Sequence, residues 1–355
     1  MIRLSEISGK LLVWYDKYHR TLPWRIPPGD SKSGILPDPY HVWLSEIMLQ
    51  QTTVTAVKPY YEKFLKLWPN ITALAETSNE SVMQAWAGLG YYSRARNLKK
   101  CAEYVVSELQ GRFPDNETEL IKLPGVGPYT AAAIASIAFQ QPVAVVDGNI
   151  ERVFARLFTI NTPLPQAKVP IKEKVAKHLP AARPGDFAQG LMDLGSSICT
   201  PKKPNCLLCP LQDICKASKL GSQESYPVKT PKKVKAKRRG AAFVIEDMDG
   251  AIYIQKRPET GLLGGMSEVP TTDWNSNQDG ETDIQSAPFS GDWQKRGEIR
   301  HVFTHFELSL IVYHIKVDIR PTLNGWWSAQ NEIEGEALPN LMKKVVLKAT
   351  DRKRK

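Results

Sequence analysis

Apolar residues return with helical spacing along roughly the first 217 residues of the chain. The pattern is clearest where apolar side chains recur every three or four positions, in segments 39–53, 54–67, 80–86 and 130–139. Extended alternation of apolar and polar residues is scarce there. Residues 1–217 are therefore predicted to form a mainly helical domain.

The pattern changes after residue 240. Segments 241–245, 251–256, 298–303 and 306–319 are rich in β-branched and aromatic residues, which favour strands. Residues 241–350 are therefore predicted to form a strand-based α/β (α+β) module, and the polar segment 271–291 is expected to be an exposed loop within it.

The segment 218–240 separates the two predicted domains. It contains Gly, Ser and Pro, followed by a run of lysines and arginines. This composition predicts a basic linker. A solvated tether and a clamp that attracts DNA phosphates both fit such a segment, and its composition favours the tether.

Length and charge fit a two-domain protein with a polyanionic partner. The chain has 355 residues, whereas single cores seldom grow beyond roughly 250 to 300 residues. Its 47 Lys and Arg exceed its 37 Asp and Glu, and the formal net charge is +10, which favours nucleic acid. Residues 1–10 lack the apolar core of an export signal, and the apolar stretch 131–139 is too short to span a bilayer. We expect a cytoplasmic, nucleoid-associated monomer that binds no membrane.

Four of the five cysteines lie within seventeen residues, at Cys199, Cys206, Cys209 and Cys215. Disulfides are rare in a chain without an export signal. Structural zinc sites commonly use two close cysteine pairs, whereas this array has one, and four thiolates are what a 4Fe–4S cluster requires. The array therefore favours an iron–sulfur cluster over zinc.

The motif Leu-Pro-Gly-Val-Gly at residues 123–127 lies between the helical stretches 117–122 and 130–139. Backbone N–H groups exposed at a helix N-terminus bind phosphate through the helix dipole and their free hydrogens. An ordinary turn between helices fits the motif equally well in isolation, and the cysteine array favours a DNA-binding hairpin. Gly125, Val126 and Gly127 are thus candidate DNA contacts.

This hairpin, the motif V-D-G-N at 146–149 and the cysteine array together resemble the helix-hairpin-helix DNA glycosylase superfamily. Nearly the whole chain resembles the MutY family of adenine DNA glycosylases, with S-E-I-M-L-Q-Q-T at 45–52, G-L-G-Y-Y-S-R-A-R-N at 88–97, L-P-W-R at 22–25 and G-L-L-G-G at 261–265. The resemblance implies a helix-hairpin-helix glycosylase domain with a 4Fe–4S cluster loop and a MutT/Nudix-like C-terminal domain. It also implies removal of adenine paired with 8-oxoguanine or guanine in double-stranded DNA.

Cleavage of an adenine N-glycosidic bond needs a proton for the departing base and a carboxylate to stabilise the cationic sugar. The resemblance implies that Glu46 donates the proton and serves the incoming water, while Asp147 stabilises the cation or forms a transient covalent adduct. By spacing alone, Glu46 also fits an exposed helix carboxylate and Asp147 an N-cap. Bifunctional members carry a lysine nucleophile where this chain has Tyr129, so hydrolysis without a Schiff-base lyase step is expected.

The resemblance implies further contacts with a flipped base and its surroundings. Tyr129 is expected to line the catalytic pocket, and the adenine pocket is expected at Trp24, Arg25 and Gln189. A flipped base leaves a gap in the stack, and DNA contacts there are expected from Gln51, Leu89 and Tyr91, of which Gln51 and Tyr91 match the wedge positions. The loop Phe303, Thr304 and His305 falls where the family has Phe-Ser-His, which contacts 8-oxoguanine.

Three other functions fit parts of the sequence. A bifunctional glycosylase-lyase is opposed by Tyr129, and a catalytically silent DNA-binding protein is opposed by the presence of both Glu46 and Asp147. A nucleotide hydrolase is opposed because its metal-binding signature is missing after Ala241. The insertion at 28–37 fits a surface loop better than a lid over the pocket.

Overall fold

The structure is a computed structural model, and it describes residues 4–230, 234–258, 260–333 and 335–350. The chain divides into two compact units, Met1–Glu76 with Asn97–Lys232, and Thr77–Arg96 with Lys233–Lys355. No helix in the described part is long and apolar enough to cross a membrane. The first unit is helical and the second is built on a mixed sheet, which confirms the predicted combination of a helical domain and a mixed α/β domain.

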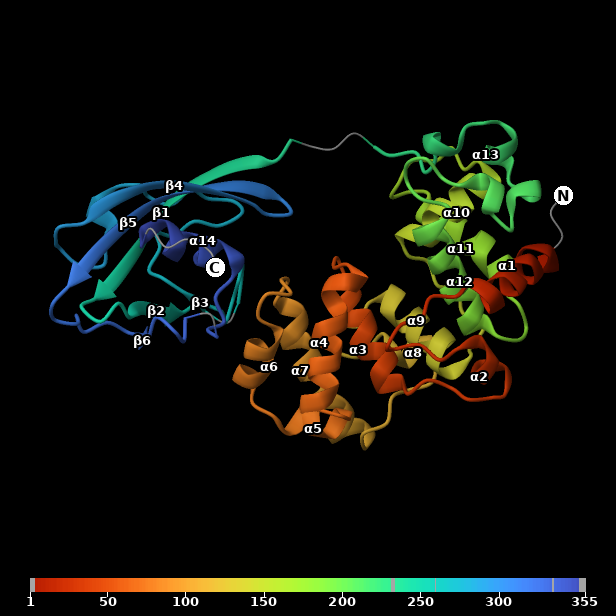
Figure 1. The fold of residues 1–355 in the computed structure, drawn as a ribbon, viewed down its shortest axis with the longest axis horizontal. Helices are drawn as coiled ribbons and strands as arrows, with labels where there is room; N and C mark the ends of the chain where they lie inside the picture. Colours follow the sequence, from red (N-terminus) through yellow and green to blue (C-terminus); the bar gives the residue numbers. More distant parts are fainter. Residues whose placement is uncertain (1–3, 231–233, 259, 334, 351–355) are drawn as a thin grey trace. The chain divides into compact units, whose positions relative to one another are not determined.

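Helices make up the first unit (Figure 1). In chain order they are α1 (Leu4–Tyr18), α2 (Pro28–Lys32), α3 (Pro39–Leu49), α4 (Val54–Leu67), α5 (Ile71–Glu76), α7 (Ser93–Leu109), α8 (Glu117–Leu120), α9 (Pro128–Phe139), α10 (Gly148–Phe158), α11 (Lys168–Lys177), α12 (Pro184–Ser197) and α13 (Lys216–Lys219). Helix α7 begins within the segment assigned to the second unit, and α6 (Asn79–Trp86) belongs to that unit. The insertion at 28–37 forms α2 and a following turn that is mostly exposed.

Helices α3 and α9 form the centre of the first unit. Helix α3 begins as the sequence predicts, because the Asp38 carboxylate accepts a hydrogen bond from the Tyr40 N–H at 2.8 Å and Pro39 occupies the first turn. Helix α9 is buried from Thr130 to Ala138, and its many alanines let α3, α8 and α12 pack closely around it. Side chains of α3, α9 and α12 line a common cavity.

The predicted linker 218–240 is shorter than expected. Val228 accepts a hydrogen bond from the Leu164 N–H at 2.9 Å, and the carbonyls of Gln223 and Tyr226 accept from Arg156, so this part packs on the first unit. Strand β1 (Ala236–Asp247) then begins before residue 240. Residues 231–233 lie outside the described residues. The composition of 218–240 did not reveal that its ends are ordered, because the backbone groups there bond to residues far away in sequence.

The second unit contains a sheet with strand order β3-β2-β1-β5-β4, and β6 pairs with β2. The strands after β1 are β2 (Ile252–Lys256), β3 (Ser267–Glu268), β4 (Gln294–Val302), β5 (Phe306–Val317) and β6 (Trp326–Ser328). Strands β1 and β5 run parallel, and the other pairs are antiparallel. Figure 1 shows α14 (Asn340–Ala349) beside this sheet.

Both faces of the sheet are covered where β1 crosses its centre. Ala242 and Val244 pack with α14, while Phe243 and Ile245 pack on the opposite face with Trp293. This period of two is the pattern expected of a strand buried on both sides. The strand assignments made from composition are therefore confirmed, with β1 and β4 longer than expected.

Segment 271–291 is not the simple exposed loop that its polar sequence predicts. Trp274 is buried against Gly240 and Phe303, and Ala242 bridges to Thr271. The segment therefore covers part of the sheet and contributes an aromatic residue to its core. The aromatic residues Trp274 and Phe289 in a polar stretch were the sequence signal of this role.

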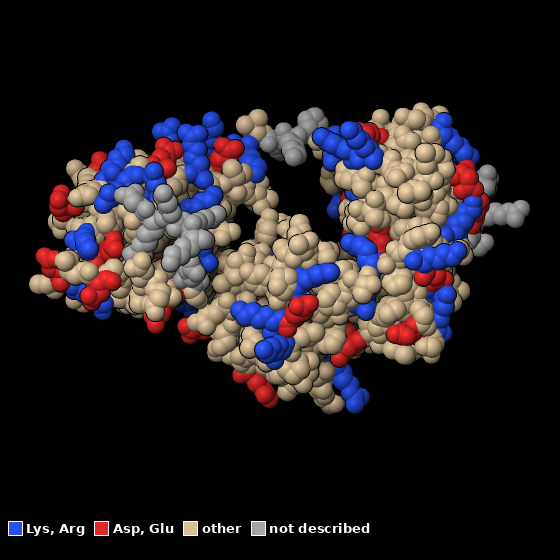
Figure 2. Space-filling model, in the orientation of Figure 1, with Lys and Arg blue, Asp and Glu red and all other residues tan. Residues whose placement is uncertain are grey.

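Positive charge gathers on part of the second unit. Figure 2 shows Lys and Arg side chains together where β1 and β4 lie in the same view. A groove of about 470 Å³ is lined by side chains of β1, β4 and β5, among them Lys237, Arg239 and Arg300. Acidic Glu298 and Glu307 also line it, so the groove is mixed with a cationic excess.

Candidate active site

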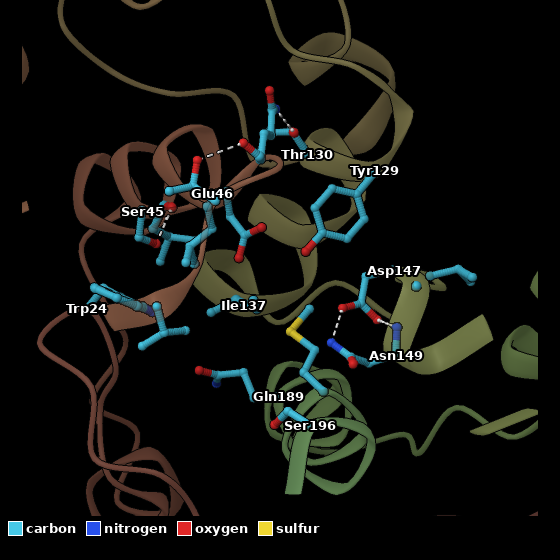
Figure 3. A pocket seen from close by; sticks show the side chains of 18 of the residues that line it. Trp24, Ser45, Glu46, Tyr129, Thr130, Ile137, Asp147, Asn149, Gln189 and Ser196 are labelled. Atoms are coloured by element: carbon cyan, nitrogen blue, oxygen red, sulfur yellow. Dashed lines mark hydrogen bonds between the residues drawn. The ribbon is translucent and has the colours of Figure 1, made fainter. Parts of the chain in front are cut away.

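A cavity of about 860 Å³ opens in the first unit. Its walls come from α3, α9, α12, the start of α10 and the segment that precedes α2. The predicted catalytic residues Glu46, Tyr129 and Asp147 all line it, as do the predicted adenine-pocket residues Trp24, Arg25 and Gln189. Residues far apart in sequence thus meet at one site, and Figure 3 shows Glu46, Tyr129 and Asp147 around the same space.

Glu46 is a buried acid and not an exposed helix carboxylate. Only 6% of the residue is exposed, on the inner face of α3. Burial raises the pKa of Glu46 to about 7, although a hydrogen bond with the Tyr129 hydroxyl and the charge of Arg25 act in the opposite direction. A carboxyl group with this pKa can both hold and release a proton near neutral pH, as a general acid must.

Tyr129 lies on the first turn of α9, directly beside Glu46. Burial and the neighbouring Glu46 and Asp147 carboxylates raise the pKa of Tyr129 well above its usual value. The phenol therefore stays protonated near neutral pH and remains a hydrogen-bond donor to Glu46.

Asp147 is both an N-cap and a cavity residue. Its Oδ1 atom accepts hydrogen bonds from the N–H groups of Asn149 at 3.0 Å and Ile150 at 2.7 Å, which caps α10. The Asn149 amide donates to Oδ2 at 2.8 Å. These bonds hold the carboxylate in one orientation at the cavity wall, where Figure 3 shows Asn149 beside it.

The three predicted adenine-pocket residues surround the cavity from two sides. Trp24 is buried with its ring edge-on to Tyr61 at 5.2 Å between centroids. Gln189 is buried on α12, and Figure 3 shows its amide at the cavity opposite Asp147. The Arg25 guanidinium donates to both carboxylate oxygens of Asp193 at 2.8 Å. A polar base entering the cavity would meet an amide, a guanidinium and an aromatic face.

The predicted hairpin joins α8 and α9. Gly125 has φ +74°, and a methyl group placed on its Cα would lie 2.6 Å from the Asn97 Cβ atom. Gly127 stands at the N-cap of α9, where no side chain satisfies the first N–H groups. Val126 is buried, so its side chain anchors the turn while the backbone is left at the surface. The geometry suits an anion bound by main-chain donors.

The three predicted wedge and groove residues differ in exposure. Gln51 is exposed, lines the cavity and has φ +57°. In the second unit Tyr91 is 48% exposed with φ +49°, and its ring lies 5.5 Å from the Arg94 guanidinium carbon. Leu89 is buried, so its side chain is not presented at the surface as a DNA contact would require. Backbone held in the left-handed region at two candidate wedges fits strained functional positions.

The predicted lesion-reading loop is the tip of the hairpin between β4 and β5. The Phe303 N–H donates to the Phe306 carbonyl at 2.8 Å, and the two rings stack at 4.7 Å. Thr304 and His305 are exposed between them. His305 is therefore no buried strand residue, and the stacked phenylalanines hold two polar side chains at the surface.

All four cysteines of the predicted cluster line one small cavity, which also contacts Arg156 and Gln223. In the described part of the chain, no three metal-binding side chains converge closely enough to hold a single ion. Cys199 Sγ accepts from Arg156 at 3.3 Å and Cys206 Sγ from Gln223 at 3.5 Å, as thiolate ligands do. Four cysteine thiolates are the donor set that a 4Fe–4S cluster requires. The fifth cysteine, Cys101, is buried elsewhere.

Two arginines of α10 connect this loop to the cavity. Arg156 is 1% exposed and donates to five backbone carbonyls, those of residues 199, 200, 201, 223 and 226. Arg152 donates to the Cys199 carbonyl at 2.7 Å and to the Asn149 amide oxygen at 2.9 Å. The cysteine loop is thus tied to the helix whose N-cap is Asp147.

Several residues at the site were not predicted from the sequence. Arg20, Met192, Asn149 and Ser196 also line the cavity, and Asp193 lies behind Arg20 and Arg25. The signal that could have found Asp193 is a single acid within the otherwise apolar and small residues at 187–195. An acid buried in such a helix needs a partner.

Three segments of the chain match known protein families. Residues 44–180 match the HhH-GPD superfamily base excision DNA repair protein, and residues 241–348 match the NUDIX domain. Residues 199–215 match the iron-sulfur binding domain of endonuclease III. This last match contains all four cysteines, which confirms them as ligands of a 4Fe–4S cluster and rules out the zinc alternative.

Solved structures support the fold of the first unit. A thermostable thymine-DNA glycosylase is 29% identical with a TM-score of 0.53, and the match covers 61% of this chain and 97% of that one. A non-covalent endonuclease III–DNA complex, 23% identical with a TM-score of 0.51, covers 62% of this chain and 99% of that one and shares the fold.

Relatives match along nearly the full sequence. Adenine DNA glycosylase from Homo sapiens is 34% identical over 96% of this chain and 73% of the relative. The enzyme from Schizosaccharomyces pombe is 32% identical over 94% and 87%, and that from Buchnera aphidicola of Schizaphis graminum 34% over 86% of each. Because these matches span both units and the cysteine loop, the chain belongs to the family of adenine DNA glycosylases, hydrolases of base-excision repair that cleave N-glycosidic bonds.

Proposed function

We propose that this protein removes adenine paired with 8-oxoguanine or guanine in double-stranded DNA, by flipping the adenine and hydrolysing its N-glycosidic bond. The observation that carries this proposal is the pair of acids in one cavity, the buried Glu46 bonded to Tyr129 and the exposed face of Asp147. A base inside a duplex cannot reach a buried acid unless it leaves the stack.

The protonated Glu46 carboxyl donates its proton to N7 of adenine as the bond to C1′ breaks. The leaving base takes the electron pair of that bond, so a neutral adenine departs and positive charge develops on the sugar. Water then adds to C1′ and returns a proton to Glu46, which restores the acid. A pKa of about 7 makes both transfers accessible near neutral pH.

Asp147 stabilises the sugar cation. Its three hydrogen bonds with Asn149 and Ile150 fix the carboxylate at the cavity wall before the substrate arrives. Such a preorganised charge favours the transition state more than the neutral ground state. A covalent adduct with C1′ would use the same oxygen atoms and the same position.

We infer that the reaction stops at base removal. A lyase of the bifunctional type forms a Schiff base through an amine. The corresponding position is Tyr129, whose phenol is bonded to Glu46, and no lysine takes its place among the residues nearest Glu46 at the cavity. Lys168 also lines the cavity, but it pairs with Glu151 at 3.3 Å and is largely exposed.

DNA is bound through both units in this proposal. The N–H groups of the hairpin at Gly125 and Gly127 donate hydrogen bonds to a DNA phosphate, and Gln51 and Tyr91 enter the space left by the flipped base. In the second unit Thr304 and His305 contact the oxidised guanine. The nearby groove offers Lys237 and Arg239 from β1 and Arg300 from β4. The four cysteines hold the iron–sulfur cluster, which cross-links its loop against α10.

The test is single-turnover release of adenine from duplexes with adenine opposite 8-oxoguanine, guanine or thymine, each with and without alkali. We expect release opposite the two guanines and strand breaks only after alkali. Glu46→Gln removes the transferable proton and should lower the rate about 100-fold or more. Glu80→Gln, at an exposed helix position, is the matched control.

Strand breaks without alkali would contradict the hydrolytic step. Equal rates of adenine release opposite thymine and opposite the two guanines would contradict recognition of the opposing guanine. Release that persists in Glu46→Gln would exclude Glu46 as the proton donor. Each outcome therefore tests a different part of the proposal.

A further inference from the structure

Asp193 is a buried acid that lies outside the cavity but controls two of its arginines. The residue is 1% exposed, on α12, and it does not line the cavity. Its oxygens accept from the Arg25 guanidinium at 2.8 Å, and from the Arg20 side chain at 2.5 Å and backbone N–H at 2.9 Å. A buried carboxylate with this many donors is held in one position.

Both arginines reach the cavity from the segment between α1 and α2. Arg25 has only 7% of its side chain exposed, while Arg20 has 33%. This segment has little regular structure of its own. The position of Arg25 therefore depends on its bond to α12, which also carries Gln189 one turn before Asp193 (Figure 3 shows Gln189).

We propose that Asp193 is a positioning residue for adenine excision, which holds Arg25 against the adenine pocket and cancels its charge beside Glu46 and Asp147. The inference rests on the proposed function. Asp193 acts through the two arginines, because they line the cavity and Asp193 does not.

The charges around Glu46 explain why this cancellation matters. Tyr129 faces it from α9, Asp147 from the start of α10, and Arg25 from the segment before α2. The remaining charged cavity residues are Arg20, Glu151 and Lys168, and Asp193 lies behind the arginines. The charge of Arg25 already lowers the pKa of Glu46, against the larger effect of burial. Without Asp193 that charge would be uncompensated, and Glu46 would lose its proton at a lower pH.

The same charge acts on the sugar. Positive charge develops on the sugar as adenine departs, and an uncancelled guanidinium nearby repels it. With Asp193 in place, Arg25 retains its hydrogen-bonding groups for the base while the pair is close to neutral. Asp193 thus lets the site use a cation for recognition without the electrostatic cost to the transition state.

The experiment measures single-turnover adenine release from the 8-oxoguanine duplex between about pH 5 and about pH 9, for the native chain and Asp193→Asn. The native rate should fall above about pH 7 as Glu46 ionises. In Asp193→Asn this fall should begin about one pH unit lower, so that the rate at high pH drops about tenfold further than the rate at low pH.

Asp186→Asn is the matched control. Asp186 is buried on the same helix, pairs with Arg183 at 2.7 Å and does not line the cavity. Its loss destabilises α12 in a similar way, but the pH at which the rate falls should stay at the native value. Thermal melting of each variant separates reduced folding from altered chemistry.

Arg20→Gln provides the opposite change and does not leave a buried cation unpaired. Removal of one cation leaves Asp193 bonded to Arg25, so the fall in rate should begin at a higher pH than in the native chain. An Asp193→Asn profile that falls at the native pH, or an equal shift in Asp186→Asn, would overturn the inference. If the native chain itself releases no adenine, the proposed function fails and not this inference alone.

Discussion

Glu46 shows how a single residue acquires its chemistry from the surrounding fold. An ordinary glutamate is ionised at neutral pH, but removal from water favours its neutral form. The Tyr129 hydroxyl and Arg25 favour the charged form, and burial outweighs them, which brings the pKa of Glu46 to about 7. The acid is thus close to half-protonated at the pH where a general acid is most useful.

The raised pKa of Glu46 implies a cost in stability. Below the unfolded pKa of about 4.5 the Glu46 carboxyl is neutral in both states, so its full contribution to the free energy of unfolding is present. As pH rises from there to the folded pKa of about 7, the carboxyl ionises in the unfolded chain but stays neutral when buried, and that contribution is lost. Glu46→Gln should therefore stabilise the protein increasingly between those pH values, by up to roughly 3 kcal/mol, and by a constant amount above them.

Chemical denaturation of both proteins at a series of pH values measures this difference. Glu80→Gln, at an exposed position, should give a nearly flat difference over the same range. A difference between Glu46→Gln and the native chain that does not grow with pH would show that Glu46 titrates normally.

The sequence predicts that Glu46 and Asp147 act together, and both line one cavity, but spacing alone could not choose between two interpretations of each residue. Asp147 fits an N-cap by spacing, and it is one, yet the same atoms also face the cavity. Glu46 fits an exposed helix carboxylate by spacing, and it is buried. The difference depends on which helices pack around α3, and this cannot be predicted from the pattern of a single helix. Asp193 was missed for the same reason.

At the scale of elements, α10 carries two kinds of contact at its two ends. Asp147 caps its N-terminus at the cavity, while Arg152 and Arg156 on later turns bind the cysteine loop. The cysteine loop and the proposed catalytic carboxylate of Asp147 are thus both held by one helix. The buried Arg156 donates to five backbone carbonyls around this loop, and Arg152 shares the one at Cys199.

Arg156→Lys should loosen the cysteine loop. An ammonium group keeps the charge but cannot bond carbonyls on several sides at once, and each buried carbonyl left unpaired costs about 1 to 3 kcal/mol. We expect a purified protein with less iron per chain and visible absorbance that is lost at lower temperature. Arg112→Lys, at an exposed position, is the matched control and should retain the native iron content.

The glycine hairpin provides a second prediction at this scale. Gly125→Ala places a Cβ atom at φ +74° and 2.6 Å from Asn97, so the turn must shift. We expect a loss of about 1 to 3 kcal/mol in stability and weaker binding to damaged and undamaged duplexes alike, because the phosphate donors move. Gly127→Ala, where an added Cβ meets nothing within 4 Å, should melt close to the native protein. Equal melting of Gly125→Ala and the native chain would contradict the strain at this turn.

Elements with a strong period were predicted best. The bounds of α4 were predicted as observed, and α9 and β5 differ only at their ends. The linker was predicted too long because Lys237, Arg238 and Arg239 read as a charge run, whereas their backbone pairs with β5. Pairing with a strand distant in sequence makes this segment extended, although its local composition favours a loop. Trp274 was placed in a loop for the same reason, since its neighbours in sequence are polar.

At the scale of the whole molecule, the residues proposed for catalysis and the loop proposed to read the lesion belong to different units. Every residue that lines the large cavity falls between Arg20 and Ser196, whereas the hairpin at Thr304 and His305 belongs to the second unit. The sheet of that unit has its own core on both faces. The NUDIX domain match, without the hydrolase signature, is consistent with a recognition role for this unit.

This division predicts that lesion preference can be removed while excision remains. A chain that ends at Thr230 keeps the complete cavity and the cysteine loop. It should still release adenine opposite guanine, at a rate lower than native by about tenfold or less, but its preference for adenine opposite 8-oxoguanine should be largely lost. The measurement is the ratio of single-turnover rates on the two duplexes.

In the full chain, Thr304→Ala with His305→Ala should lower the same ratio without a change in melting temperature, because both side chains are exposed. If the shortened chain keeps the native ratio, the first unit alone reads the lesion, and the β4–β5 hairpin has no part in recognition.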